Sequence, residues 1–138
     1  MSGTIDSQSV EQTRPRSDRD VVYVGYRKRG QTIVKKQPNQ EQLTPARSLK
    51  LVSHSPTGFE WGYGGSGPAQ LAHALLLDYT DDAEIAMAHY IEFKNVVVSQ
   101  LECSTPDGRW RLTGSAIDAA LHDLAEDTRQ IQPADSHE

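Results

Sequence analysis

The chain has 138 residues, of which 36% are hydrophobic, so its length and composition suit one small domain with polar ends. No run of about 18 apolar residues is present to cross a membrane, and the polar N-terminus lacks the apolar segment of a secretion signal. The single cysteine, Cys103, excludes an internal disulfide framework and fits a reducing compartment, so we expect a cytoplasmic protein with no membrane contact.

The net charge of −5 conceals an unequal distribution along the chain. Residues 1–58 contain ten Lys and Arg against five Asp and Glu, whereas residues 59–138 contain four against fourteen. A basic first half and an acidic second half indicate either a nucleic-acid contact or a contact between the two halves. Charge alone favours the second interpretation at least as strongly as the first.

The N-terminal part of the domain is predicted to be a β-hairpin. Residues 1–20 are polar with little to bury, which is typical of a disordered tail. Residues 21–36 contain two groups of β-branched and aromatic residues separated by Arg29-Gly30, a pair that favours a turn. After the hairpin, a short third strand is predicted at 40–43, and residues 48–53 indicate either a short strand or a turn of helix.

Basic residues cluster at the tip of this hairpin, with Arg27, Lys28 and Arg29 in succession and two further lysines on the return strand. Such a cluster can bind phosphate groups. The alternative is a solvated tip with a charged edge that discourages strand-to-strand aggregation. From the sequence we favour this alternative.

A glycine-rich aromatic loop follows the hairpin. Five of the ten glycines lie in the stretch 58–67, interspersed with the aromatic residues Phe59, Trp61 and Tyr63. Glycine allows the backbone to turn sharply and to approach other groups closely. We predict that at least two of the three rings are buried against the first or second helix. Exposed rings beside free backbone amides would instead indicate an anion site at the helix N-terminus.

The first helix is predicted directly after this loop. Pro68 suits the first position of a helix, because its missing N–H costs nothing there. Ser66 or Gly67 is the expected cap, with Gln70 reaching back toward it. The apolar positions fall on one side of this helix: Leu71, Ala72, Leu75, Leu76 and Tyr79.

The second helix begins at Asp81 or Asp82, either of which can cap it. Its apolar positions cover nearly half of its circumference, so we expect it to contact two neighbours. Lys94 falls in the middle of this face, where it must either reach water or meet a carboxylate. We predict an ion pair between Lys94 and Glu60. The apolar positions are Ala86, Met87, Tyr90, Ile91, Phe93, Val97, Val98 and Leu101.

The last helix follows a short extended piece at 110–112 and begins at Thr113 or Ser115. It combines a narrow apolar stripe with an acidic outer face. From about Thr128 the chain becomes polar again, so residues 128–138 are predicted to be a flexible acidic tail. The single domain therefore spans residues 21–127.

The candidate functional residues lie in and around the glycine-rich loop. The pattern Gly62-x-Gly64-x-x-Gly67 matches a dinucleotide-binding motif, but too few residues follow it for a doubly wound sheet. We therefore favour a structural turn, with a ligand-binding or partner-binding loop as the alternative. The histidine and cysteine spacing predicts no metal site, and no cofactor is expected. The candidate loop residues are His54, Glu60, Trp61, Tyr63, Gly64, Gly65 and Ser66.

A catalytic group of His54, Glu60 and Tyr63 is conceivable, because all three residues lie near one loop. Sequence neighbourhood is not geometry, however, and a hydrogen-bonded structural cluster is the interpretation that we favour.

The run His54–Ala72 reads H-S-P-T-G-F-E-W-G-Y-G-G-S-G-P-A-Q-L-A, and similar matches occur at Tyr23–Gly25 and Trp110–Thr113. This pattern resembles a family catalogued as domain of unknown function 6166, over about Tyr23 to Ile117. The resemblance implies a prokaryotic, intracellular protein of bacteria, archaea or their mobile elements. It implies no activity and no catalytic residues.

We expect an α+β fold in which an N-terminal β-hairpin or small antiparallel sheet packs with about three helices between disordered tails. The leading hypothesis is a non-enzymatic binding or accessory module whose partner is a protein or a nucleic acid. The alternative is a small enzyme, or a binder of small ligands or anions, that uses the loop 58–67 at a helix N-terminus. A buried loop favours the first hypothesis, and an open cleft with shifted ionisation favours the second.

Overall fold

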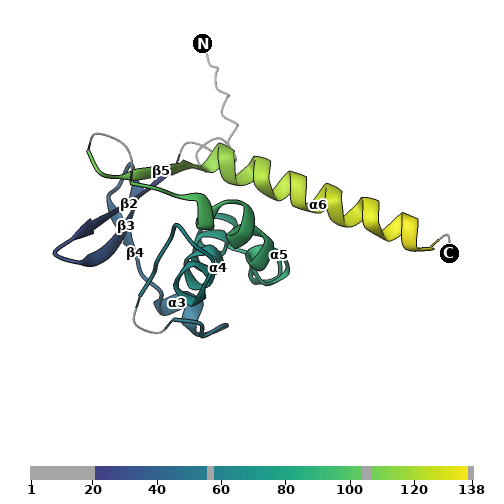
Figure 1. Ribbon diagram of the computed structural model, residues 1–138, viewed down its shortest axis with the longest axis horizontal. Coiled ribbons are helices and arrows are strands. Elements are labelled where there is room, and N and C mark those ends of the chain that lie inside the picture. Colours follow the sequence, from purple (N-terminus) through teal and green to yellow (C-terminus); the bar gives the residue numbers. More distant parts are fainter. Residues whose placement is uncertain (1–20, 56–57, 104–106, 137–138) are drawn as a thin grey trace, which may run out of the picture.

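The computed structural model describes residues 21–55, 58–103 and 107–136 and has an α+β architecture (Figure 1). Helices α3, α4 and α5 gather on one side of a four-stranded sheet, and α6 extends away from the end of β5 (Figure 1). The predicted disordered tail at residues 1–20 lies outside the described residues. The elements are β2 (Val22–Lys28), β3 (Gln31–Gln37), β4 (Glu41–Leu43), α3 (Ala46–Leu49), α4 (Ser66–Thr80), α5 (Ala83–Val96), the 3-10 turn η1 (Val98–Gln100), β5 (Trp110–Thr113) and α6 (Gly114–Ser136).

None of the described helices combines the length and the apolar character needed to span a membrane.

The predicted hairpin is confirmed, with β2 and β3 paired antiparallel and joined by a turn at Arg29-Gly30. Arg29 has φ 55° and Gly30 has φ 81°, and two consecutive positive φ values are typical of a two-residue hairpin turn. The short third strand is confirmed as β4. β5 pairs with the other side of β2, so the strand order is β4-β3-β2-β5.

The sheet has two distinct faces, because successive side chains of a strand point to opposite sides. The inner face carries Tyr23, Gly25 and Val34 and faces the helices. The Tyr23 hydroxyl donates a hydrogen bond of 2.6 Å to Asp78 on α4, which joins this face to the helical layer. The residues that alternate with these, beginning with Val22 and Val24 on β2, form the outer face.

A close approach between two strands defines the centre of the inner face. Trp110 of β5 is the register partner of Gly25 on β2, and a Cβ atom at Gly25 would lie 2.2 Å from the indole ring. Glycine is therefore required at this position, because any side chain would overlap the indole. Trp61 of the glycine-rich loop stands edge-on to Trp110, with ring centroids 5.3 Å apart.

The start of α4 differs from the prediction. Gly65 is the residue that caps the helix, rather than Ser66 or Gly67, and Pro68 is the third helical residue. Proline is tolerated there because the N–H groups of the first turn have no acceptor within the helix. Gln70 does not reach back toward the cap, because its side chain points to the segment that precedes the loop.

The other helix starts agree with the sequence. Asp82 caps α5 and accepts hydrogen bonds from the N–H groups of Glu84 and Ile85, at 3.0 and 3.2 Å. Thr113 caps α6 by accepting a hydrogen bond of 3.0 Å from the N–H of Ala116. α6 continues past residue 128, where the flexible tail was predicted to begin.

The core lies between the inner face of the sheet and the helices. α5 contacts both α4 and α6, as predicted, but its apolar face is narrower than the sequence pattern suggested. Met87 and Ile91 are 44% and 42% exposed. The largest fully buried hydrophobic side chains are Tyr23, Phe93, Leu71, Leu75, Leu76, Ile117, Val34 and Val98.

The buried carboxamide of Gln70 joins α4 to the segment that precedes the loop. Its Oε1 accepts hydrogen bonds from the N–H groups of His54 and Ser55, at 2.7 and 3.0 Å. Its Nε2 donates to Ser48 Oγ on α3 and to the carbonyl oxygen of Val52, at 2.7 and 3.1 Å. All four hydrogen-bonding positions of the carboxamide are thus used, as a buried polar group requires.

His73 extends this network into the core. Its Nδ1 lies 2.7 Å from Ser48 Oγ, and its ring stands at 89° to the ring of Tyr90. Its Nε2 has no hydrogen-bond partner among the described residues. Burial, and then the nearby charge of His54, lower the pKa of His73, so the folded protein favours the neutral ring.

The first prediction concerns the Gln70 network. Gln70→Met keeps the length of the side chain but removes its polar atoms, so two partly buried N–H groups lose their acceptor. We expect the free energy of unfolding to fall by about 2–4 kcal/mol, since each unsatisfied buried group costs about 1–3 kcal/mol. Urea unfolding at neutral pH measures the change. Gln100→Met on the exposed surface is the matched control, and equal unfolding midpoints for the two variants would contradict the prediction.

The second prediction concerns pH. Because the pKa of His73 is lower in the folded state than its ordinary value of 6.5, the unfolded chain binds the proton more readily. His73 therefore leaves the free energy of unfolding unchanged above about pH 6.5. Below that pH it lowers the free energy of unfolding by up to about 1.4 kcal/mol per pH unit. In His73→Asn, which keeps an acceptor for Ser48, the loss between pH 6.5 and 5 should be smaller. A curve with the wild-type slope would rule out His73 as its source, and His122→Asn on the exposed face of α6 is the control.

Candidate functional site

The glycine-rich loop is held against the sheet by its own aromatic rings. Phe59 and Trp61 are 5% and 4% exposed, which confirms that at least two of the three rings are buried. Tyr63 is the exception and is 51% exposed. The edge-on contact of Trp61 with Trp110 ties the loop to β5.

Side chains of the loop also fill the space beside the N-terminus of α4. A Cβ atom at Gly67 would lie 2.6 Å from Glu60 Cβ, and one at Gly65 would lie 2.8 Å from the ring of Tyr63. Gly64 and Ser66 are exposed. At Gly67 glycine is therefore required, because the atoms beside it belong to the start of the Glu60 side chain and to its backbone, whereas the exposed ring of Tyr63 could move away from a side chain at Gly65.

Two of the three residues in the hypothetical catalytic group, His54 and Glu60, have separate partners. His54 Nε2 lies 2.8 Å from the hydroxyl of Tyr90 on α5. Glu60 forms an ion pair with Arg27 on β2. Within the described part of the chain, no hydrogen bond or ion pair joins any two of His54, Glu60 and Tyr63.

The predicted partner of Glu60 was Lys94, and the structure replaces it with Arg27. Among the described residues no ion pair joins Lys94 to Glu60. The Arg27 guanidinium also lies 4.8 Å from the centroid of the Trp61 ring. Both charged side chains are more than one third exposed, so the ion pair contributes about 1 kcal/mol or less. The sequence did not indicate this pair, because the hairpin and the loop meet only in the folded chain.

Ser48 and His73 form a hydroxyl–imidazole pair that the sequence analysis did not identify. Such a pair can activate a serine nucleophile. Here the two residues are 1% and 0% exposed, and Gln70 also donates to Ser48 Oγ. The hydroxyl is thus held between two core side chains, Gln70 and His73, and we interpret the pair as part of the buried network.

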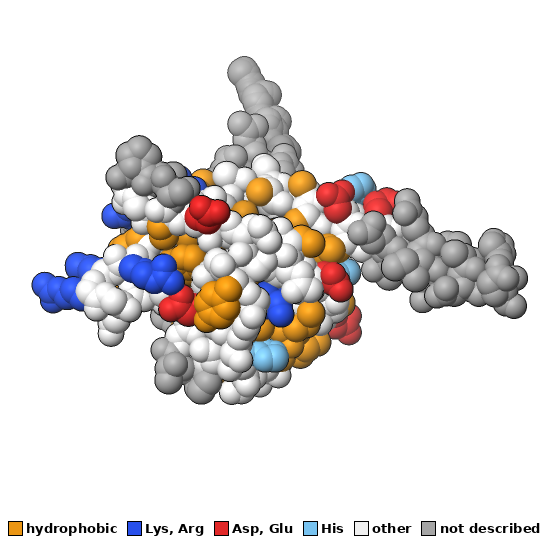
Figure 2. All heavy atoms as spheres, in the orientation of Figure 1, with side chains coloured by type: hydrophobic (Ala, Val, Ile, Leu, Met, Phe, Trp, Pro, Cys, Tyr) orange, Lys and Arg blue, Asp and Glu red, His pale blue; other side chains and the backbone are white. Residues whose placement is uncertain are grey.

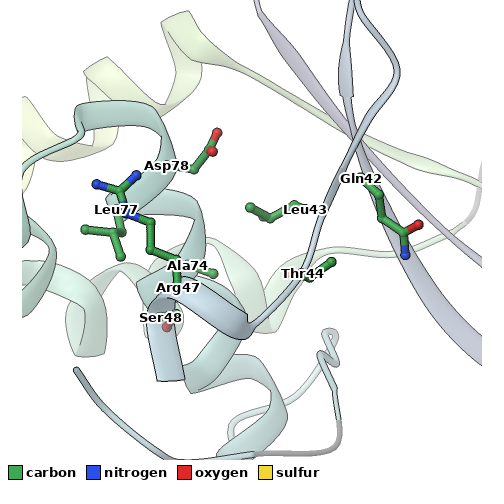
Figure 3. Close-up of a pocket in the computed structure, with 8 residues that line it drawn as sticks. All are labelled: Gln42, Leu43, Thr44, Arg47, Ser48, Ala74, Leu77 and Asp78. Carbon is green, nitrogen blue, oxygen red and sulfur yellow. The ribbon is translucent and has the colours of Figure 1, made fainter. Parts of the chain in front are cut away.

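A pocket of about 180 Å³ lies between β4, α3 and α4 (Figure 3). Figure 3 shows Leu43 and Thr44 on one side of it and Leu77 and Asp78 on the other. Asp78 forms an ion pair of 3.1 Å with Lys36, and Arg47 on α3 forms one of 2.5 Å with Asp81. These pairs neutralise the charges at the pocket. The full lining is Gln42, Leu43, Thr44, Arg47, Ser48, Ala74, Leu77 and Asp78.

Four cations belong to the outer face of the sheet. Lys28 and Lys35 lie there by strand alternation, and Arg111 of β5 is the register partner of Val24 on the same face. Val24 is also the partner of Lys35, so it stands between two long cationic side chains. It is only 3% exposed, consistent with the apolar stems of its neighbours lying over it. The fourth cation, Arg109, lies over the ring of Tyr26 at 4.2 Å from its centroid.

One carboxylate lies beside this face in the described chain. Asp107 forms an ion pair of 2.5 Å with Arg111. The hydrogen bond from Arg111 to Asp107 raises the pKa of Arg111 above its ordinary value, and the negative charge of Asp107 adds a smaller effect in the same direction. Lys28 and Lys35 form no ion pair with any described residue, and the described residues of this face carry more positive than negative charge.

The three residues of the predicted phosphate-binding cluster do not lie on one face of the sheet. Lys28 and Arg29 are exposed, whereas Arg27 belongs to the inner face and is paired with Glu60. Arg109 and Arg111 were not predicted as part of a basic surface. The alternation of buried Trp110 and Leu112 with exposed Arg111 was a local signal of a half-buried strand, but its position beside β2 required the fold.

Within residues 21–55, 58–103 and 107–136, no three His, Cys, Asp or Glu side chains are arranged to hold a metal ion.

The family model described as a family of unknown function, DUF6166, matches residues 23–123. No curated protein and no solved structure matches the chain. Because the family match covers most of the sequence, including the hairpin, the glycine-rich loop and β5, the chain belongs to the family of unknown function DUF6166.

Proposed function

We propose that this protein is a non-enzymatic binding module whose partner is a nucleic acid, and that the outer face of the sheet binds its phosphate groups. The observation that carries the proposal is the grouping of Lys28, Lys35, Arg109 and Arg111 on that face, with Asp107 as the neighbouring acid. Clustered cations on one surface are the electrostatic basis of nucleic-acid binding. Exposed Arg29 at the hairpin tip extends the same surface.

The distribution of charge over the molecule supports this choice. Lys and Arg side chains gather toward the hairpin end, whereas several Asp and Glu side chains lie toward the helical end (Figure 2). A polyanion is therefore attracted to the sheet and repelled from the helices, which orients it as it approaches. We further propose that the protein acts in the cytoplasm of a prokaryote or its mobile element, as the family resemblance implies.

The alternative of a ligand site at the glycine-rich loop has less support. Glu60 lies beside Gly67 and Tyr63 beside Gly65, so part of the space at the start of α4 is occupied by the chain itself, although Ser66 is exposed. An anion would also meet the Glu60 carboxylate there. We therefore assign the loop a structural role.

A protein partner would use another surface. Met87 and Ile91 on α5 are both more than 40% exposed, and exposed apolar side chains are typical of protein contacts. Lys94 lies on the same helix. If this protein bound no nucleic acid but bound another protein through α5, the result would favour a protein partner.

The third prediction tests the basic face. The double variant Lys28→Gln, Lys35→Gln should bind a labelled nucleic acid several-fold more weakly than the wild type, because two phosphate contacts are lost. The plot of log affinity against log salt should become shallower by about 1.4–1.8, since each contact contributes about 0.7 on a single strand and 0.9 on a duplex. Fluorescence anisotropy between about 50 and 300 mM NaCl measures both quantities.

The charge-matched control is Arg47→Gln, Lys50→Gln, which removes two exposed cations from the region of α3. This control should bind as the wild type does. If the wild type shows no salt-sensitive binding, or if the two double variants lose equal affinity, the proposed interface is wrong.

A further inference from the structure

Tyr26 is the aromatic residue of the outer face, and its surroundings distinguish one class of nucleic acid from another. The Arg109 guanidinium lies 4.2 Å from the centroid of its ring, and Ile33 is its register partner on β3. A planar cation on an aromatic ring, beside an apolar side chain, forms a flat platform. Bases stack on aromatic rings and on arginine planes without regard to their sequence.

We propose that the nucleic acid is single-stranded and that one of its bases stacks on the platform formed by Tyr26 and Arg109. This inference rests on the proposed function, and it names the substrate class of the same site. The bases of a duplex are stacked on one another, so their faces are not available to a protein side chain. A stacking platform is therefore useful only to a strand whose bases are unpaired.

The cations surround this platform in a way that suits an extended backbone. Lys28 follows Tyr26 by two residues on the same face of β2. Lys35 and Arg111 flank Val24, the preceding residue of that face, on the two neighbouring strands. Positive charge is thus present on both sides of the ring along β2, and a strand that crosses the sheet can place a base on the platform while its phosphates meet these side chains.

Duplex binding by this fold would use a different element. The hairpin tip, with Lys28 and Arg29, is the part of the sheet that can enter a groove, as two-stranded ribbons do. Tyr26 lies within β2 rather than at the tip, and a groove-bound hairpin has no use for its ring. The role of Tyr26 therefore separates the two modes.

The test compares a labelled single strand of roughly 20 nucleotides, longer than one such site, with the duplex of the same sequence. Fluorescence anisotropy at one salt concentration should show at least about tenfold tighter binding of the single strand. Tyr26→Leu should weaken single-strand binding about tenfold, the typical effect of losing one stacked base, with the salt dependence unchanged. Tyr26→Phe, which keeps the ring, should bind as the wild type does.

Tyr63→Leu is the matched control, because this exposed tyrosine lies in the glycine-rich loop and not on the outer face. It should leave both affinities unchanged. Circular dichroism establishes that the variants are folded, so that weaker binding by Tyr26→Leu reports the loss of the ring.

The outcomes separate this inference from the proposed function. Equal binding of single strand and duplex, with Tyr26→Leu unaltered, overturns the stacking platform and leaves the basic interface standing. Preference for the duplex, with Tyr26 dispensable, replaces the platform with a groove-bound hairpin. Absence of binding to either probe overturns both proposals.

Discussion

The contact between Trp110 and Gly25 is the constraint on which the arrangement of the sheet depends. β5 is short and follows the helices α4 and α5 in the sequence, so it pairs with β2 across a long stretch of chain. The indole occupies the space of a missing Cβ atom at Gly25, so the observed register requires glycine at this position. Trp61 packs edge-on against the same indole, an aromatic contact that contributes about 0.5–1.5 kcal/mol beyond the area it buries.

This register also determines what the other side of the sheet presents. Because side chains alternate, burying Trp110 and Leu112 on the inner face directs Arg111 to the outer face beside Val24. A slip of one residue would bury the arginine and expose the indole. The packing of the core and the charge of the proposed interface are therefore set by the same strand pairing, and a substitution at Gly25 would disturb both.

Local signals were enough for the hairpin and for the start of α5, and long-range contacts explain much of what the sequence did not predict. Arg29-Gly30 indicated the hairpin turn and Asp82 the start of α5, because each acts within a few residues of itself. The partner of Glu60 depended instead on how the hairpin meets the loop, and Lys94 was the wrong choice. The side chain of Gln70 was expected at a helix cap, but it satisfies buried groups that lie at least 15 residues away in the chain.

The charge asymmetry of the chain indicated either a contact between its two halves or a contact with a nucleic acid. Because side chains alternate along a strand, one hairpin can present cations for both. Among the described residues, three ion pairs join the basic first half to the acidic second half: Arg27 with Glu60, Lys36 with Asp78 and Arg47 with Asp81. Lys35, the neighbour of Lys36, points to the opposite face and has no such acid opposite it among the described residues. The inner cations Arg27 and Lys36 are thus paired within the molecule, whereas the outer cations Lys28 and Lys35 form no ion pair with a described residue. A reversal of the alternation at this point would exchange the two groups of cations, which is why the composition of the hairpin alone did not reveal which of them lie on the proposed interface.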